Sequence, residues 1–203
     1  MAGTKKIKTR SMELSEITYR EDPCPMDAQE VREIVISSGF FSKDETDVAV
    51  ELVEERLRKG LASGYYFVFA EKEKEVIGYA CFGPIPCTVG SYDLYWIAVK
   101  NHLRGSGLGR EILHRVEQKI MAWGGKRIYM ETSSKQQYRP THAFYKKCGY
   151  RKEAVLRDFY SPGDHKMIFM KKVYETVDRE EESGSGRKDS QASSSGTNYR
   201  TVI

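Results

Sequence analysis

Apolar residues along this chain recur with two periods, one typical of strands and one typical of helices. Short apolar or alternating runs predict strands at residues 17–20, 65–70, 76–82, 92–99, 127–132, 153–159 and 165–173. Helical spacing predicts a helix that begins at Asp27, a second from Asp44 to a stop at Gly60, and two more at 108–123 and 140–148. The order β α α β β β α β α β β predicts one α/β (mixed α+β) domain, with a mixed, mostly antiparallel sheet and helices on both faces.

The predicted helices are marked by apolar stripes of different width and by residues typical of helix ends. The helix 108–123 has an apolar residue at every fourth position, namely Leu108, Ile112, Val116 and Ile120. The helix that begins at Asp44 has a broader apolar stripe of Val48, Ala49, Leu52, Val53 and Leu57. Asp27-x-x-Glu30 predicts a capping box at the start of the first helix. Pro140 fits the first turn of the last helix, and Gly149 fits its end.

The composition is typical of a soluble globular protein. Of the 203 residues, 39% are hydrophobic and 31% are charged, and the formal net charge is +4. Four positive charges lie in the first ten residues, and no basic stripe with interleaved aromatic residues follows, so we expect no nucleic-acid partner. No apolar run approaches the roughly 20 residues of a membrane span, so we expect no membrane association.

The four cysteines, Cys24, Cys81, Cys87 and Cys148, lack the spacing of a disulfide framework, and the histidines do not flank them at metal-ligand distances. We therefore expect reduced thiols, no bound metal and a cytoplasmic location. Residues 1–14 are polar and predicted to be flexible, and the Ser-, Gly- and charge-rich residues 175–203 are predicted to be a disordered tail. Residues 15–174 remain as the folded domain.

The segment Arg104-Gly105-Ser106-Gly107-Leu108-Gly109-Arg110 lies between a predicted central strand and the longest helix. A glycine turn at a helix start leaves several backbone N–H groups without intrahelical partners. The helix dipole adds partial positive charge there, and glycines let a phosphate approach the main chain. The arginines at both ends add further charge. We therefore predict an anion-binding turn whose ligand is a diphosphate.

The spacing of these glycines argues against two common nucleotide sites. A dinucleotide-binding turn needs glycine where this chain has Arg110, and a P-loop needs a G-x-x-x-x-G-K-[ST] motif that the chain lacks. Arg104-x-x-Gly107-x-Gly109 instead resembles [R/Q]-x-x-G-x-[G/A], the diphosphate-binding signature of the GNAT superfamily of acyl-CoA-dependent N-acyltransferases. In that superfamily the signature likewise follows an apolar strand and begins a long amphipathic helix.

A second block, about thirty residues later, carries the same resemblance. Residues 141–150 are similar to the family's short helix A-x-x-[F/L]-Y-x-x-x-G-[F/Y] at the pairs Phe144-Tyr145 and Gly149-Tyr150. In the family the tyrosine that matches Tyr145 donates a proton to the leaving CoA thiolate. This role suits a phenol beside a thiolate whose conjugate acid has a pKa of about 8.5.

The resemblance covers about residues 15–173 and implies acetyl-CoA or another short acyl-CoA as cofactor. The implied cofactor contacts are Ile97, Ala98, Val99, Arg104, Gly105, Ser106, Gly107, Leu108, Gly109, Arg110 and Tyr145. The strand residues among them would act through their backbone, which predicts a bulge between strand 92–99 and its neighbour. Many relatives have an asparagine shortly before the Phe-Tyr pair, where this chain has Arg139 and Pro140, so Tyr145 is the one side-chain contact carried over from this helix.

An amine must lose a proton before it attacks a thioester, so we expect a base. Asp93 stands at the strand position where several relatives carry a catalytic Glu, and burial would have to raise its pKa. Strict alternation places Asp93 on one face with Tyr95, Ile97 and Val99. Water held by Tyr95, and Glu131 on the next strand, are the alternatives.

The family builds its acceptor pocket from the first two helices, their loop and the last hairpin, here Phe40-Phe41 and Asp158-Phe159-Tyr160. Aromatic rings beside an aspartate suit a cationic amine. The resemblance therefore implies transfer of an acetyl or similar acyl group to a primary amine, which we expect to be a small molecule. Two alternatives are a protein or peptide N-acetyltransferase and a CoA-binding sensor or scaffold without turnover. Relatives are often dimers, so a homodimer is a further expectation.

Overall fold

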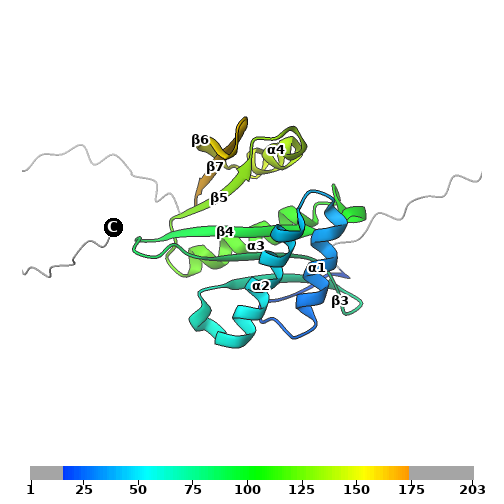
Figure 1. Cartoon of the computed structure of the whole chain (residues 1–203). Helices are drawn as coiled ribbons and strands as arrows, with labels where there is room; N and C mark the ends of the chain where they lie inside the picture. Colours follow the sequence, from blue (N-terminus) through cyan, green and yellow to red (C-terminus); the bar gives the residue numbers. More distant parts are fainter. Residues whose placement is uncertain (1–15, 174–203) are drawn as a thin grey trace, which may run out of the picture.

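The computed structural model describes residues 16–173 (Figure 1). The predicted flexible N-terminus and the predicted disordered tail lie outside the described residues. The strands are β1 (Thr18–Arg20), β2 (Tyr66–Lys72), β3 (Glu75–Pro84), β4 (Ser91–Val99), β5 (Arg127–Ser133), β6 (Arg151–Ser161) and β7 (Asp164–Lys172). The α-helices are α1 (Asp27–Ser38), α2 (Lys43–Lys59), α3 (Leu108–Ala122) and α4 (Arg139–Lys147). Short 3₁₀ turns lie at η2 (Gly60–Ser63), η3 (Asn101–Leu103) and η4 (Gln136–Tyr138). Apart from these turns, the order of elements is the predicted one.

These strands form one sheet in the order β1-β2-β3-β4-β5-β7-β6. Neighbouring strands are antiparallel except for β4 and β5, which are parallel. The helix α3 connects these two, because parallel neighbours need a long crossover connection. The predicted mixed, mostly antiparallel sheet is therefore confirmed.

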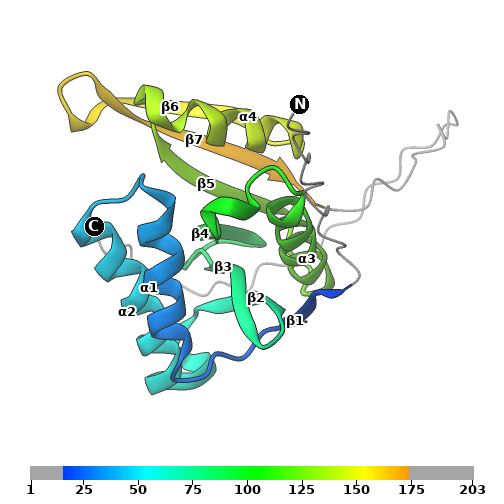
Figure 2. The ribbon, with the colours of Figure 1, turned by 90° about the vertical axis from the view of Figure 1, so that its right-hand side faces the viewer.

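Helices cover both faces of the sheet, as predicted (Figure 2). The sheet divides the core into two clusters. The α1/α2 cluster includes Val31, Ile34, Val53, Phe67, Tyr79 and Ala98. The α3/α4 cluster includes Leu94, Leu108, Ile112, Val116, Ile120 and Tyr145. All four residues of the predicted α3 stripe are completely buried. Each such side chain contributes about 1.5–3 kcal/mol by leaving water, which holds α3 against the sheet.

The capping box predicted at the first helix is wrong. Asp27 is the first residue of α1, and the N-cap residue Met26 makes no side-chain capping bond. The buried carboxylate of Asp27 instead accepts a hydrogen bond from Arg20 on β1 (2.7 Å), a contact that local sequence does not encode. A capping box begins α2: the Ser42 hydroxyl accepts from the Glu45 N–H, and the Glu45 carboxylate accepts from the Ser42 N–H.

The stripe predicted for the second helix is partly wrong. Ala49 and Val53 are buried, but Val48 is 46% exposed and Leu57 is 39% exposed. Arg56 is buried in place of Leu57, because its guanidinium donates a hydrogen bond to the Tyr65 carbonyl (2.8 Å). Among residues 16–173, no helix combines the length and the apolar character that crossing a membrane would require.

Candidate active site

The sheet splits in its middle, between β4 and β5. The two strands pair over three residues each, from Ser91 opposite Arg127 to Asp93 opposite Tyr129. Beyond Asp93 they diverge (Figure 1), so among the described strands only β3 pairs with the stretch 94–99 of β4. The backbone groups of β4 that face β5 along this stretch have no partner on any strand of residues 16–173. An open edge of this kind binds extended ligands through main-chain hydrogen bonds.

β4 also contains the predicted bulge. Cys81 of β3 lies opposite Trp96, and Phe82 lies opposite Leu94, so Tyr95 is an extra residue with no partner on β3. A bulge bends its strand and re-aims the side chains on either side of it. The disruption lies within the stretch of β4 that is open toward β5.

The bulge changes which side chains share a face. Leu94, Ile97 and Val99 all belong to the α3/α4 cluster, which strict alternation forbids. Asp93 is the neighbour of Leu94 and therefore points to the opposite face, that of α1 and α2. The expectation that Asp93 shares a face with Ile97 and Val99 is wrong, because the extra residue shifts the alternation by one.

The glycine turn lies at the start of α3, after η3. Gly105 and Gly107 have φ angles of 80° and 94°, and Gly107 is the N-cap residue. The Ser106 N–H donates to the Leu103 carbonyl, and the Leu108 N–H donates to the Ser106 hydroxyl. Within the described chain, the N–H groups of Gly105, Gly107 and Gly109 have no acceptor. Three unpaired N–H groups at a helix N-terminus form an anion site.

The two arginines that flank this turn have different surroundings. Arg110 is exposed on the first turn of α3 and forms no ion pair with any described residue. Arg104 points away from the turn, with its guanidinium 4.4 Å from the centre of the Phe40 ring. It also donates a hydrogen bond to the Ser38 carbonyl (3.4 Å). Arg110 is therefore available to an anion, whereas the Arg104 side chain is engaged by the end of α1 and the residues after it.

α4 approaches the glycine turn through Phe144. A Cβ atom on Gly109 would lie 3.7 Å from the Phe144 ring and 4.0 Å from a Val99 methyl group, so β4, α3 and α4 meet at this point. The next residue, Tyr145, is 6% exposed and packs against Phe169, with 5.7 Å between ring centroids. Burial raises the pKa of the Tyr145 phenol, so the hydroxyl keeps its proton at neutral pH.

Asp93 stands where β4 and β5 separate. Burial raises its pKa to about 6; the negative charge of Glu131 adds to this effect, and the positive charge of Lys166 opposes it. Lys166 is also paired with Glu131 at 2.6 Å. Burial and the charge of Asp93 raise the pKa of Tyr95 to about 12. Glu131 and Tyr95 are thus each within electrostatic reach of Asp93.

The loop after α1 and the last hairpin, both predicted to hold the acceptor, meet at Tyr138 of η4. The Tyr138 hydroxyl donates to the Phe40 carbonyl (3.3 Å). Burial raises the pKa of Tyr160 on β6 to about 12, with further contributions from Glu131, from Asp164 and from Tyr138 itself. Glu131 of β5, Asp164 of β7 and Tyr138 of η4 are therefore within electrostatic reach of the Tyr160 hydroxyl.

Asp158 and Phe159, the other two hairpin residues, make different contacts from those of Tyr160. Asp158 has a φ of 52°, and its carboxylate accepts a hydrogen bond from the Gly163 N–H (2.7 Å), so it closes the hairpin turn. Phe159 is 53% exposed and has the Lys166 ammonium 3.8 Å from its ring centre. Lys166 also pairs with Glu131, so Phe159 and Tyr160 both lie on the side of the hairpin that faces this candidate base.

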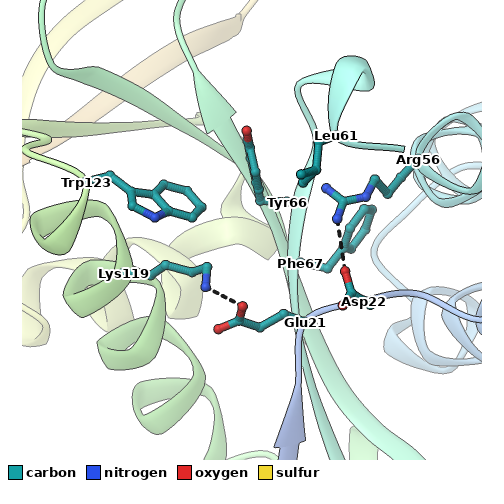
Figure 3. A pocket seen from close by; sticks show the side chains of 8 residues that line it. All are labelled: Glu21, Asp22, Arg56, Leu61, Tyr66, Phe67, Lys119 and Trp123. Carbon is teal, nitrogen blue, oxygen red and sulfur yellow. Dashed lines mark hydrogen bonds and ion pairs between the residues drawn. The ribbon is translucent and has the colours of Figure 1, made fainter. Parts of the chain in front are cut away.

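A separate pocket lies beside Trp123, at the end of α3 remote from the glycine turn (Figure 3). Its charged lining residues are already paired, Arg56 with Asp22 (3.1 Å) and Lys119 with Glu21. A charged ligand would have to break these pairs. The pocket therefore lacks the free N–H groups and the unpaired arginine that distinguish the glycine turn.

Sequence reasoning missed three residues at this site: Tyr138, Asp164 and Lys166. Tyr138 had a local signal, since it is an aromatic residue directly before the last helix. Lys166 had none, because its partner Glu131 lies on another strand. Asp164 also had no local signal: it is 4% exposed and paired with Lys135 (3.2 Å), which follows β5.

Comparisons with known proteins bear on this geometry. Residues 28–150 match the family model of the acetyltransferase (GNAT) family. A crystal structure from Desulfovibrio desulfuricans, assigned to the GNAT acetyltransferases, is similar at 48% identity over 77% of this chain and 99% of that chain, with a TM-score of 0.76.

Two further solved structures share the fold at low identity. The ribosomal-protein-S18-alanine N-acetyltransferase of Escherichia coli is 14% identical over 80% of this chain and 97% of its own, with a TM-score of 0.63. The PaiA N-acetyltransferase of Thermoplasma acidophilum, in complex with coenzyme A, is 18% identical over 77% and 98%, with a TM-score of 0.60. None of the curated proteins matches this chain.

Proposed function

Because this chain belongs to the GNAT family of acetyltransferases, we propose that it moves an acetyl or similar short acyl group from acyl-CoA to a primary amine. In this proposal both substrates are bound together and the amine attacks the thioester directly. The observation that carries the proposal is the set of three N–H groups, at Gly105, Gly107 and Gly109, that have no acceptor within residues 16–173. They lie at the positive end of α3, next to the open edge of β4, where a diphosphate and its pantetheine arm fit one after the other.

The proposed cofactor site has two parts. The diphosphate is bound by the backbone N–H groups of Gly105, Gly107 and Gly109, with Arg110, which is unpaired among the described residues, adding a positive charge. The pantetheine arm lies along residues 97–99 of β4, whose backbone groups pair with no strand on the β5 side. Ile97 and Val99 support this placement, since they remain partly exposed although they face the α3/α4 cluster.

The chemistry that we propose starts from the neutral amine, an ammonium having first released one proton to solvent, and moves one further proton from the nitrogen to the cofactor sulfur. The amine nitrogen forms a bond to the thioester carbon, and the bond from that carbon to sulfur breaks. Asp93, directly or through water, takes the proton that the nitrogen loses. Tyr145 donates a hydrogen bond and then a proton to the departing thiolate, and solvent returns both side chains to their starting states.

The acceptor that we propose is a small-molecule amine. The support is a series of neighbouring groups: Tyr138 bonds to the Phe40 carbonyl, Tyr138 and Glu131 both influence the Tyr160 phenol, and Glu131 influences Asp93, which together bring rings and carboxylates to one region. Such a lining suits a compact cationic amine.

Release of free CoA thiol, measured across a panel of amines with acetyl-, propionyl- and succinyl-CoA, tests the proposal. We expect at least one small primary amine to be acylated, with the acetyl donor preferred. The panel includes peptides with free N-termini and lysines as competitors for the acceptor role. Turnover of peptides alone would replace the small-molecule proposal. CoA binding without any turnover would favour a sensor.

Asp93→Asn is expected to reduce kcat about 10²-fold, the lower end of what a positioned base contributes. Wild-type kcat is expected to rise with pH through about 6 and then to level off, because Asp93 must be ionised to accept a proton. The variant should lose this rise, as measured in a pH profile of kcat at saturating substrates.

Two neighbouring variants control this assignment. Glu131→Gln removes a negative charge near Asp93 and should move the rise to lower pH, whereas Lys166→Met removes a positive charge and should move it to higher pH. If Asp93→Asn keeps the rise at pH 6, Asp93 is not the base, and Glu131 becomes the next candidate.

A further inference from the structure

Arg104 is the first residue of the diphosphate-binding signature, but its side chain contacts another part of the molecule. The guanidinium lies 4.4 Å from the centre of the Phe40 ring and within hydrogen-bond distance of the Ser38 carbonyl. Ser38 is the last residue of α1, and Phe40 follows it after Gly39. A cation over an aromatic face is attracted by the ring, so the contact connects the glycine turn to the chain after α1.

The segment of residues 39–41, here called the acceptor turn, is held from two further sides. The side chains of Gln137 and Tyr138 both donate to the Phe40 carbonyl, each at 3.3 Å. Phe41 packs on Trp96 of β4, with ring centroids 5.1 Å apart. The acceptor turn therefore connects the glycine turn, the central strand and η4.

Gly39 makes this turn dependent on such contacts. It ends α1 with a φ of 70°, and nothing lies within 4 Å of the position that its Cβ would occupy. Because a glycine hinge has wide backbone freedom, contacts beyond it must fix where Phe40 and Phe41 lie. Arg104 supplies the contact that comes from the glycine turn.

We propose that Arg104 is a positioning residue for the amine acceptor, holding the acceptor turn through Phe40 while the backbone of its own loop holds the CoA diphosphate. The inference rests on the proposed function, since it assumes that Phe40, Tyr138 and Tyr160 surround the acceptor. It departs from the family signature at Arg104. The charge of Arg104 positions the acceptor turn, and the charge of Arg110 binds the diphosphate.

Arg104→Met tests this assignment, because methionine keeps much of the side-chain length without the charge. The KM for the best amine of the panel is expected to rise about two- to fivefold, the value of an exposed cation–π contact, with kcat unchanged. The Kd for CoA, measured by calorimetry, should change less than twofold. Amide hydrogen exchange over residues 38–42 should become faster in the variant.

Matched variants separate positioning from general damage. Arg110→Met makes the same substitution in the same loop and should weaken CoA binding about tenfold or more, as expected for a charged contact to phosphate. Arg104→Lys keeps a cation over Phe40 and should recover most of the amine KM. Phe40→Leu should raise the amine KM as Arg104→Met does, and the double variant should add little, because both changes remove the same contact.

Three results would overturn the inference: tenfold weaker CoA binding by Arg104→Met, an unchanged amine KM, or unchanged exchange over residues 38–42. The first would make Arg104 a diphosphate ligand. Failure of the proposed function is distinguishable, because it appears as a wild-type chain that acylates no amine. In that case the exchange measurement still decides whether Arg104 holds the acceptor turn.

Discussion

Replacing Gly107 with valine is expected to weaken CoA binding by more than about 100-fold. Gly107 has a φ of 94°, and a β-branched residue there costs of the order of 1–3 kcal/mol in backbone strain. Relief of that strain would turn the N–H groups of the glycine turn away from the diphosphate. Each such charge-assisted hydrogen bond is worth about 1.5–3 kcal/mol, so losing one or two accounts for the expected factor. Calorimetric titration with CoA measures the effect.

Two other glycines provide the controls. Gly124, just beyond α3, also has a positive φ (76°) and open space around its Cβ position, so Gly124→Val imposes similar strain away from the site. It should lower the melting temperature but leave the Kd for CoA unchanged. Gly109→Ala should bind CoA almost normally, because its Cβ would meet Phe144 at an ordinary contact distance of 3.7 Å. If Gly107→Val bound CoA with wild-type affinity, the backbone N–H groups of the glycine turn would not be the diphosphate ligands.

The order of elements and the glycine turn could be predicted because their signals are local. The α3 stripe repeats every four residues, and Leu108, Ile112, Val116 and Ile120 all proved fully buried. The glycines at 105 and 107 mark a turn that needs positive φ, and the structure has it there. Such patterns predict the structure correctly because they depend only on residues that are close together in the sequence.

The errors came from contacts between distant residues. The Asp27 carboxylate binds Arg20 on β1, so a sequence pattern that fits a capping box does not form one. The extra residue Tyr95 is defined only by the pairing of β4 with β3, so strict alternation placed Asp93 on the wrong face. In each case an adjacent strand decides the outcome, and single-sequence periodicity contains no information about that strand.

The electrostatic interactions of the site could not be predicted from the sequence either. Burial and Glu131 raise the pKa of Asp93 to about 6, but neither effect can be inferred before β4 and β5 are known to separate beside it. The position of Arg104 against Phe40 joins residues 64 positions apart. The sequence therefore indicates residue types that suit the proposed chemistry, and the fold determines which of them lie close to one another.

Tyr145→Phe is expected to reduce kcat by about 10²- to 10³-fold while the Kd for CoA stays within twofold of the wild type. The phenol is buried and its pKa is raised, so it enters the reaction protonated and can stabilise the sulfur as the bond to carbon breaks. Phenylalanine keeps the ring that packs on Phe169, so the fold and the cofactor site should persist. Single-turnover release of CoA thiol isolates the chemical step from product release.

Tyr79→Phe is the matched control, because it also removes one hydroxyl from a fully buried tyrosine. Tyr79 lies in the α1/α2 cluster, and its hydroxyl has no hydrogen-bond partner among the described residues. Its loss should leave kcat unchanged and should not lower stability, since an unsatisfied buried hydroxyl stabilises nothing. If Tyr145→Phe releases CoA at the wild-type rate at every pH, the phenol does not protonate the leaving group. The thiolate would then depart unassisted or take its proton from water at the open edge of β4.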